Sequence, residues 1–241
     1  MTVTRMVAVV LGGGVGTRFG AGRPKQLLAL DGKTLVEHCV AAFSAAPGID
    51  EVLLVMGADY IKEAAALVSD MGGTAQDCAV IEGGVTRAGS VRNAISYLSA
   101  RHEPMTTGVL FHDAARPLVD QRVIADCVAA LREHDAIGTA VPTPDTIVVV
   151  KDGVMHHVPP RETLMRCQTP QGFRLSVIAL AHEMAAKDPA FVPTDDCGVI
   201  LRYLPDVPVH VVQGSERTMK VTYPADLAIA EILLSRGTLT G

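Results

Sequence analysis

The sequence lacks the features that mark a membrane or exported protein. None of its apolar runs approaches the roughly 20 residues needed to cross a bilayer. Its N-terminus shows no charged leader followed by a long apolar core. We therefore expect a soluble, unexported, cytoplasmic protein that does not act at a membrane.

Several patterns typical of metal sites and nucleophiles are also missing. The five cysteines, at positions 39, 78, 127, 167 and 197, form no C-x-x-C pair, which speaks against a structural zinc site and a disulfide framework. We expect them to be reduced and mostly buried as small core residues; Cys197 differs from the others in that it directly follows two aspartates. The eight histidines contain no H-E-x-x-H pattern, and no G-x-S-x-G elbow is present. Metal ligation by histidine and serine-hydrolase chemistry are therefore disfavoured.

The charge balance argues against a nucleic-acid partner. The formal net charge is −5, and basic residues gather only around one glycine-rich segment near the N-terminus. A small polyanion fits this distribution better than a nucleic acid. With 241 residues and 49% hydrophobic content, the chain can bury a full core and suits one α/β domain over residues 1–241.

The glycine-rich segment covers residues 11–26 and directly follows the apolar run 6–11. An apolar run of this length is typical of a buried strand, and glycines behind it let backbone N–H groups approach an anion. The segment also carries Arg18, Arg23 and Lys25, whose charges suit a polyphosphate. A purely structural glycine turn is the alternative, but it leaves these cations unexplained.

Two better-known phosphate motifs fail here. Phe19 or Thr17 stands where the third glycine of G-x-G-x-x-G belongs, which disfavours a nicotinamide or flavin site. No Tyr-x-x-x-Lys is visible either, so an NAD-linked oxidoreductase is a remote alternative. Residues 32–34 imitate the end of a P-loop, but Leu27 occupies the required glycine position. We predict a turn that leads into a helix there.

Seven further segments follow along the chain: residues 82–90 (EGGVTRAGS), 112–117 (HDAARP), 145–146, Arg161, 168–171 (QTPQ), 194–196 (TDD) and 219–222 (MKVT). Together with the glycine loop, they stand in the order found in nucleotidyltransferases that activate sugar and polyol phosphates. More narrowly, the chain resembles the cytidylyltransferases that make CDP-methylerythritol or CDP-ribitol. The likeness extends from residue 6 to about residue 235.

Apolar periodicity predicts the fold independently of this resemblance. Strand-like runs lie at 6–11, 52–56, 78–82, 108–112 and 137–141, and helical patterns lie between them at about 34–46, 59–71, 88–100 and 121–133. This alternation predicts a Rossmann-like, mostly parallel twisted sheet flanked by helices. Ligands of such sheets bind beyond the carboxyl ends of the strands, where the glycine loop and the segments after residues 82 and 112 should meet.

The segment at about 143–170 breaks the alternation. Residues 146–150 and 154–158 are predicted to form a hairpin around Asp152 and Gly153, which ends at Pro159 and Pro160. The resemblance implies a β-arm that crosses to the partner subunit of a homodimer with shared active sites. An ordinary surface hairpin is the alternative. Nearer the C-terminus, Thr222 and Gly237 bracket a further predicted helix.

The resemblance implies a reaction in which a phosphate monoester attacks the α-phosphorus of CTP. Such a nucleophile is already ionised near neutral pH, so positioning and charge neutralisation must carry the catalysis. By resemblance, Arg18, Lys25 and Lys220 are catalytic cations. Mg²⁺ is expected to bridge the nucleotide phosphates and retain several waters, so no protein ligand is assigned to it.

The resemblance also assigns residues to the two substrates. Those expected to bind the nucleotide are Gly12, Gly13, Gly14, Gly16, Gly83, Gly84, Arg87 and Ser90. Those expected to bind the polyol phosphate are Asp113, Arg116, Thr146, Arg161 and Thr169. Ser90 also has a structural alternative, since it could be the N-cap of the helix that follows.

The neighbouring carboxylates Asp195 and Asp196 do not predict a paired-carboxylate site, because adjacent side chains diverge by about 100° on a helix. They predict a helix N-cap at Thr194 or Asp195 instead.

The choice of polyol stays open at this point. The methylerythritol branch usually has Pro-Ala-Ala-Gly where this chain has residues 11–14 (LGGG), and that loop and residues 194–197 lean toward the ribitol branch. The glycine loop faces the nucleotide, however, so it need not select the polyol. Methylerythritol 4-phosphate is the leading substrate because that branch is the more widespread. A non-catalytic nucleotide sensor is disfavoured because Lys25, Arg161 and Lys220 are all present.

Overall fold

A computed structural model describes residues 2–14, 23–75 and 78–235. Two of the predicted site residues, Gly16 and Arg18, lie outside the described residues. Their assignments therefore stay predictions from the sequence.

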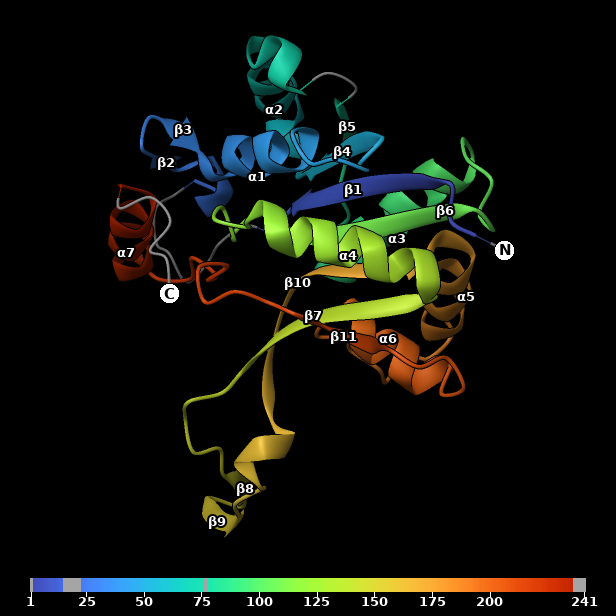
Figure 1. The fold of residues 1–241 in the computed structure, drawn as a ribbon, viewed down its shortest axis with the longest axis vertical. Coiled ribbons are helices and arrows are strands. Elements are labelled where there is room, and N and C mark those ends of the chain that lie inside the picture. The colour runs from blue at the N-terminus through green and yellow to red at the C-terminus, as the bar shows by residue number, and fades with distance from the viewer. Residues whose placement is uncertain (1, 15–22, 76–77, 236–241) are drawn as a thin grey trace.

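The described chain is built around a seven-stranded sheet in the order β11-β7-β10-β6-β1-β4-β5 (Figure 1). Only β10 runs antiparallel to its neighbours β6 and β7; the other pairings are parallel. The strands are β1 (Arg5–Gly12), β4 (Glu51–Met56), β5 (Cys78–Glu82), β6 (Thr107–Asp113), β7 (Ala136–Pro142), β10 (Met165–Arg174) and β11 (His210–Gln213). The predicted fold class and the five predicted strands are confirmed.

Helices cover both faces of this sheet (Figure 1). They are α1 (Leu35–Ser44), α2 (Ile61–Asp70), α3 (Arg87–Ser99), α4 (Gln121–Glu133), α5 (Leu175–Ala185), α6 (Asp196–Tyr203) and α7 (Pro224–Ser235). The four helices predicted between the strands and the helix before residue 237 are therefore confirmed. None of the helices in the described part of the chain is long and apolar enough to cross a membrane.

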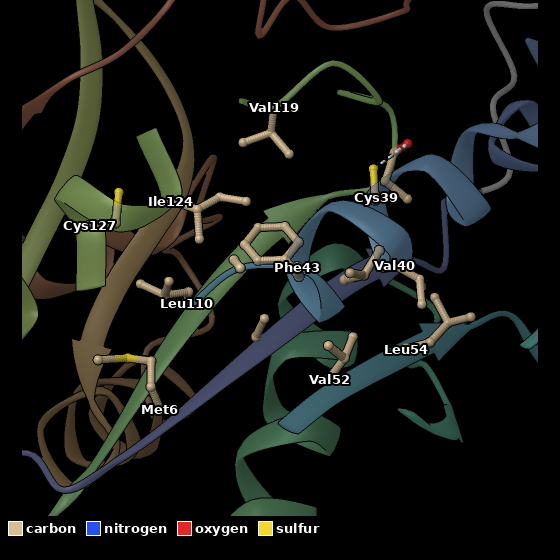
Figure 2. Close-up of a cluster of buried hydrophobic side chains, with 14 of the residues drawn as sticks. Met6, Cys39, Val40, Phe43, Val52, Leu54, Leu110, Val119, Ile124 and Cys127 are labelled. Atoms are coloured by element: carbon tan, nitrogen blue, oxygen red, sulfur yellow. Dashed lines mark hydrogen bonds between the residues drawn. The ribbon is translucent and has the colours of Figure 1, made fainter. Parts of the chain in front are cut away.

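The alternation of side chains along β1 divides the core into two layers. Met6, Ala8 and Val10 pack in a cluster with α1 and α4, whereas Val7 and Val9 pack on the other face with α3, α5 and α6. Both sets are almost completely buried. Figure 2 shows the first layer, in which Phe43 of α1 lies among side chains of α4 and of the strands. A parallel sheet with two covered faces results, which explains why its strands are continuous apolar runs.

A tight turn leads into α1, as predicted for residues 32–34. Asp31 and Gly32 both have positive φ, at 48° and 77°. Short strands β2 (Ala29–Leu30) and β3 (Lys33–Thr34) flank this turn. Thr34 then caps the helix in a reciprocal pair with Glu37, whose backbone N–H donates to Thr34 Oγ1 at 3.3 Å.

The hairpin predicted around Asp152 and Gly153 is present. Strands β8 (Val149–Lys151) and β9 (Val154–His157) pair antiparallel, and the two turn residues have φ of 52° and 79°. Figure 1 shows the hairpin projecting well away from the sheet. It carries exposed apolar side chains, among them Val154 and Met155, which are 68% and 71% exposed.

Candidate active site

A cleft of about 600 Å³ lies where β1, β5 and β6 end. This volume falls in the range of small-molecule sites. The predicted site residues that line it are Gly12, Gly13, Gly14, Lys25, Gly83, Gly84, Arg87, Ser90, Asp113 and Lys220. The structure thus brings together the loops that the sequence placed at the carboxyl edge of the sheet.

The glycines on two of these loops allow the backbones to approach each other around Ser90. A Cβ at Gly13 would come within 2.8 Å of Ser90 Oγ, and a Cβ at Gly83 within 2.7 Å. At Gly84 a Cβ would meet backbone atoms of Gly89 at 2.6 Å. Side chains at these positions would therefore push the loops apart.

Ser90 fixes the turn that ends β5. The residue is only 2% exposed, and its Oγ accepts a hydrogen bond from the Gly84 N–H at 3.2 Å. The alternative role as a helix N-cap is wrong, because Thr86 caps α3 and accepts from the Gly89 N–H at 3.0 Å.

Gln26 is a residue of the cleft that the sequence analysis did not single out. Its buried side-chain amide donates to the carbonyl oxygen of Gly12 and, at 2.7 Å, to that of Gly14. These bonds fix the backbone of the glycine loop directly after β1. The signal was its place at the end of the glycine-rich segment 11–26, next to Lys25.

Lys25 connects the glycine loop to the C-terminal part of the chain. It lies at the start of a short 3-10 turn, Lys25–Leu27, and its Nζ donates to the Val221 carbonyl oxygen at 2.7 Å. Val221 follows Lys220, which lines the same cleft. The two predicted catalytic lysines therefore come from segments that contact each other.

Asp113, the last residue of β6, stands between two cations. Its Oδ2 lies 2.7 Å from Lys220 Nζ, and its Oδ1 lies 3.3 Å from Arg87 Nε. Burial opposes ionisation of this carboxyl group, but Arg87 and Lys220 outweigh that effect and hold its pKa well below the usual range. Asp113 is therefore ionised at neutral pH.

His112 organises two of the residues predicted to bind the polyol phosphate. Burial lowers its pKa to about 4, so the ring is neutral at pH 7. Its Nε2–H donates to the Arg116 carbonyl oxygen at 3.0 Å, and its Nδ1 accepts from Thr169 Oγ1 at 3.0 Å. The Thr169 hydroxyl oxygen also accepts from the Asp113 N–H at 3.1 Å. His112 was part of a recognised motif, but only its contacts reveal this role.

Arg116 lies next to the cleft rather than in its wall. Its guanidinium donates to the Thr218 carbonyl oxygen at 2.8 Å. Its Nε is buried without a hydrogen-bond partner in the structure. One donor of this guanidinium is therefore held by the backbone.

Thr146 and Arg161 lie on the projecting arm and do not line the cleft of their own chain. They contact each other, since Arg161 donates to Thr146 Oγ1 at 3.0 Å. A short 3-10 turn, Arg161–Thr163, carries the arginine. The structure thus pairs the two predicted arm residues but does not bring them to the other predicted site residues of the same chain.

Asp195 and Asp196 have separate roles, as their adjacency predicted. Asp195 caps α6 and accepts from the Gly198 N–H at 2.9 Å. Asp196 points to a different partner, Arg87, at 2.7 Å. Within the described residues, no group of three or more His, Cys, Asp and Glu side chains could hold a metal ion.

The chain matches known proteins over almost its whole length. The family model described as 2-C-methyl-D-erythritol 4-phosphate cytidylyltransferase covers residues 6–236. The protein of that name from Thermobifida fusca is 47% identical over 97% of this chain and 94% of its own length. The chain belongs to the 2-C-methyl-D-erythritol 4-phosphate cytidylyltransferase family. The resemblance carried by the motifs is thereby confirmed.

Solved structures agree with this family. A 2-C-methyl-D-erythritol 4-phosphate cytidylyltransferase from Thermus thermophilus is 30% identical and superposes with a TM-score of 0.72 over 98% of this chain and all of its own. A synthase from Anaerococcus prevotii, with a TM-score of 0.84 over 96% of both chains but 24% identity, supports the fold alone. One relative has a different activity in its name. It is the bifunctional ribulose 5-phosphate reductase/CDP-ribitol pyrophosphorylase of Haemophilus influenzae, 35% identical over 97% of this chain and 49% of its own length.

Proposed function

We propose that this member of the family transfers CMP from CTP to 2-C-methyl-D-erythritol 4-phosphate and releases pyrophosphate. One structural observation carries the proposal: Lys25 and Lys220, from opposite ends of the sequence, line one cleft with the glycine loop. The names of the relatives that match the chain end to end support the substrates.

The reaction needs little proton transfer. A phosphate oxygen of the polyol phosphate forms a bond to the α-phosphorus of CTP, and the bond from that phosphorus to the α–β bridging oxygen breaks. The electron pair leaves with pyrophosphate. Because the attacking phosphate is already ionised, the protein's main contribution is to offset negative charge and align the two groups.

The cations of the cleft suit that contribution. Lys25 and Lys220 are placed to neutralise charge on the α-phosphoryl group and the departing pyrophosphate. Arg18 belongs to the same glycine loop in the sequence, and we assign it the triphosphate as well. Backbone N–H groups of Gly12, Gly13, Gly14 and Gly16 are proposed to approach the phosphates.

The turn after β5 suits a pyrimidine. Gly83 and Gly84 present backbone groups at the cleft, and Ser90 holds their conformation. Gly13 and Gly83 pack closely on Ser90, which holds the backbone of this turn in place. A small base ring can approach these backbone groups closely, which favours cytosine over a purine.

Mg²⁺ fits this site as a partner of the substrate. Asp113 already faces two cations, and the described residues supply no cage of carboxylates. We therefore propose that the phosphates of CTP and water molecules are the main ligands of Mg²⁺. The ion would neutralise further negative charge on the phosphates.

The polyol-phosphate site is proposed to form between two subunits. Asp113, Arg116 and Thr169 would come from one chain, because His112 gathers them beside the cleft. Thr146 and Arg161 would come from the partner's arm, since these residues do not line their own chain's cleft. Exposed apolar side chains of the hairpin give the arm a surface that a second subunit would bury.

We place the enzyme in the cytoplasm, because cysteines without disulfide bonds are typical of proteins in that compartment.

A pyrophosphate-release assay with CTP and Mg²⁺ tests the proposal. Methylerythritol 4-phosphate should support turnover, and ribitol 5-phosphate should support much less. Turnover with ribitol 5-phosphate alone would instead favour the CDP-ribitol activity, to which the glycine loop of residues 11–14 and the Haemophilus relative point. CTP binding without turnover on either compound would favour a nucleotide sensor.

A further inference from the structure

Arg87 bridges two carboxylates instead of presenting its whole guanidinium to the cleft. Its Nε lies 3.3 Å from Asp113 Oδ1, and its NH2 group lies 2.7 Å from Asp196 Oδ2. The arginine lies at the first position of α3, whereas Asp113 ends β6 and Asp196 begins α6. One guanidinium thus joins three elements that are distant in sequence.

Asp196 is the buried anchor of this chain of contacts. Its side chain is only 1% exposed, and its Oδ1 lies 3.2 Å from Nε2 of His182, which is 3% exposed. Its backbone N–H donates to Gln171 Oε1 at 3.1 Å, which fixes the start of α6 from β10. A carboxylate so far from water requires a fixed cation, so Arg87 cannot leave it at low cost.

The opposite end of the chain of contacts reaches the cleft. Asp113 and Arg87 both line it, but Asp196 does not. Asp113 is held on one side by Arg87 and on the other by Lys220, which is itself 40% exposed. Of the two cations that hold Asp113, Arg87 is the rigid one because Asp196 fixes it. Lys220 is the one that can turn toward a substrate.

We propose that Asp196 is a positioning residue, which fixes Arg87 so that Arg87 sets the orientation of the Asp113 carboxylate at the polyol-phosphate end of the cleft. This inference rests on the proposed function. It gives Arg87 a role through Asp113 in place of the nucleotide contact that the resemblance implied. It also explains why a second aspartate follows the one that caps α6.

Asp196→Asn tests the proposal because it keeps the size of the side chain and removes its charge. With Arg87 no longer anchored, Asp113 should lose its fixed orientation. We expect KM for the polyol phosphate to rise about 10-fold while KM for CTP stays within about twofold. A purely structural role would reduce the amount of active enzyme and leave both KM values unchanged, and this result would overturn the proposal.

Arg87→Lys gives a second variant that retains the charge. An ammonium group cannot bridge two carboxylates as a planar guanidinium does, so the same change in KM is expected. The double variant should raise KM for the polyol phosphate little more than the worse single variant does, because both substitutions act through one contact. Additive losses would show that Asp196 does not act through Arg87 and would overturn the proposal.

Asp188→Asn is the matched control. Asp188 also lies beside an arginine, at 3.3 Å from Arg202, but on the surface and not in the cleft. Its KM values should equal those of the wild type. A wild type that forms no CDP product with either polyol phosphate defeats the proposed function and this inference with it. An active wild type whose Asp196→Asn variant keeps its KM for the polyol phosphate defeats the inference alone.

Discussion

The ammonium group of Lys220 lies 2.7 Å from the carboxylate of Asp113, which precedes it by 107 residues. This ion pair holds a predicted catalytic cation at the edge of the cleft. We expect an incoming phosphate, which carries more negative charge, to compete with Asp113 for Lys220, while Asp113 retains its ion pair with Arg87. The ion pair with Asp113 thus positions the Lys220 ammonium group at the cleft, and no second carboxylate is required.

Lys25→Ala should separate chemistry from folding. The lysine is expected to strengthen its interaction as pyrophosphate departs, so its loss should lower kcat by about 10² to 10³. Steady-state kinetics and a thermal melt measure the two effects. Lys33→Ala, an exposed lysine in β3, is the control and should behave as wild type. A near-normal kcat for Lys25→Ala would make it an ordinary surface cation.

CTP should support turnover much better than ATP or GTP. The expectation follows from the proposed base site, where Gly83 and Gly84 present backbone groups to the cleft and Ser90 holds their turn. Initial rates with each triphosphate at equal concentration measure the preference. Equal rates with a purine nucleotide would reject the assignment of the base site.

Gly84→Ala should disturb both the cleft and the fold. The added Cβ would lie 2.6 Å from backbone atoms of Gly89, which cannot move as a flexible side chain does. We expect a loss of about 1 to 3 kcal/mol in the free energy of unfolding, together with weaker CTP binding. Gly73→Ala is the control, because no atom lies within 4 Å of its added Cβ. Urea unfolding and CTP titration of both variants check this, and an unaffected Gly84→Ala would contradict the described turn.

Acid should destabilise the protein through His112. Burial lowers the pKa of this ring from 6.5 to about 4, so between these pH values the unfolded chain binds a proton that the folded chain does not. The free energy of unfolding should therefore fall by about 3 kcal/mol from this group as the pH drops from 6.5 to 4. Urea unfolding across this range measures the slope. His112→Asn should be less stable at pH 7 but show a shallower slope, and an unchanged slope would reject a buried neutral His112.

Exchange between two inactive variants tests the shared site. Arg161→Ala should raise KM for the polyol phosphate, since a charge-assisted contact of this type contributes about 1.5 to 3 kcal/mol, and it should leave CTP binding nearly unchanged. Lys25→Ala damages the other half of the site. Mixed dimers of the two variants would carry one intact site and should regain up to about half of the wild-type activity. If subunits exchange and no activity returns, Arg161 serves its own subunit.

The strands and helices around the cleft could be predicted because the two covered faces of a parallel sheet demand apolar runs. Residues 6–11 and 108–112 are such runs, and the structure makes strands of both. The apolar pattern did not predict β10, because this strand contains the buried polar side chains of Gln168 and Gln171. They are satisfied by bonds to Ser215 and Asp195, which no periodicity reveals. The edge strand β11 is only four residues long and only partly buried.

The site was predictable to the extent that motif residues touch the cleft. Lys25 and Lys220 stand in recognised motifs, and the structure places both at one cleft. Gln26, His112 and Asp196 also lie in recognised segments, but their roles depend on partners elsewhere in the chain. A linear pattern shows which residues recur and not what they bind. Their contacts therefore had to come from the structure.

The most direct measurement of the central claim is a competition between the two polyol phosphates. The enzyme would be incubated with CTP, Mg²⁺ and equal concentrations of methylerythritol 4-phosphate and ribitol 5-phosphate, and the CDP products would be quantified by mass spectrometry. The account predicts that CDP-methylerythritol forms in large excess, with one pyrophosphate released for each molecule. A mixture dominated by CDP-ribitol, or no CDP product from either compound, would contradict it.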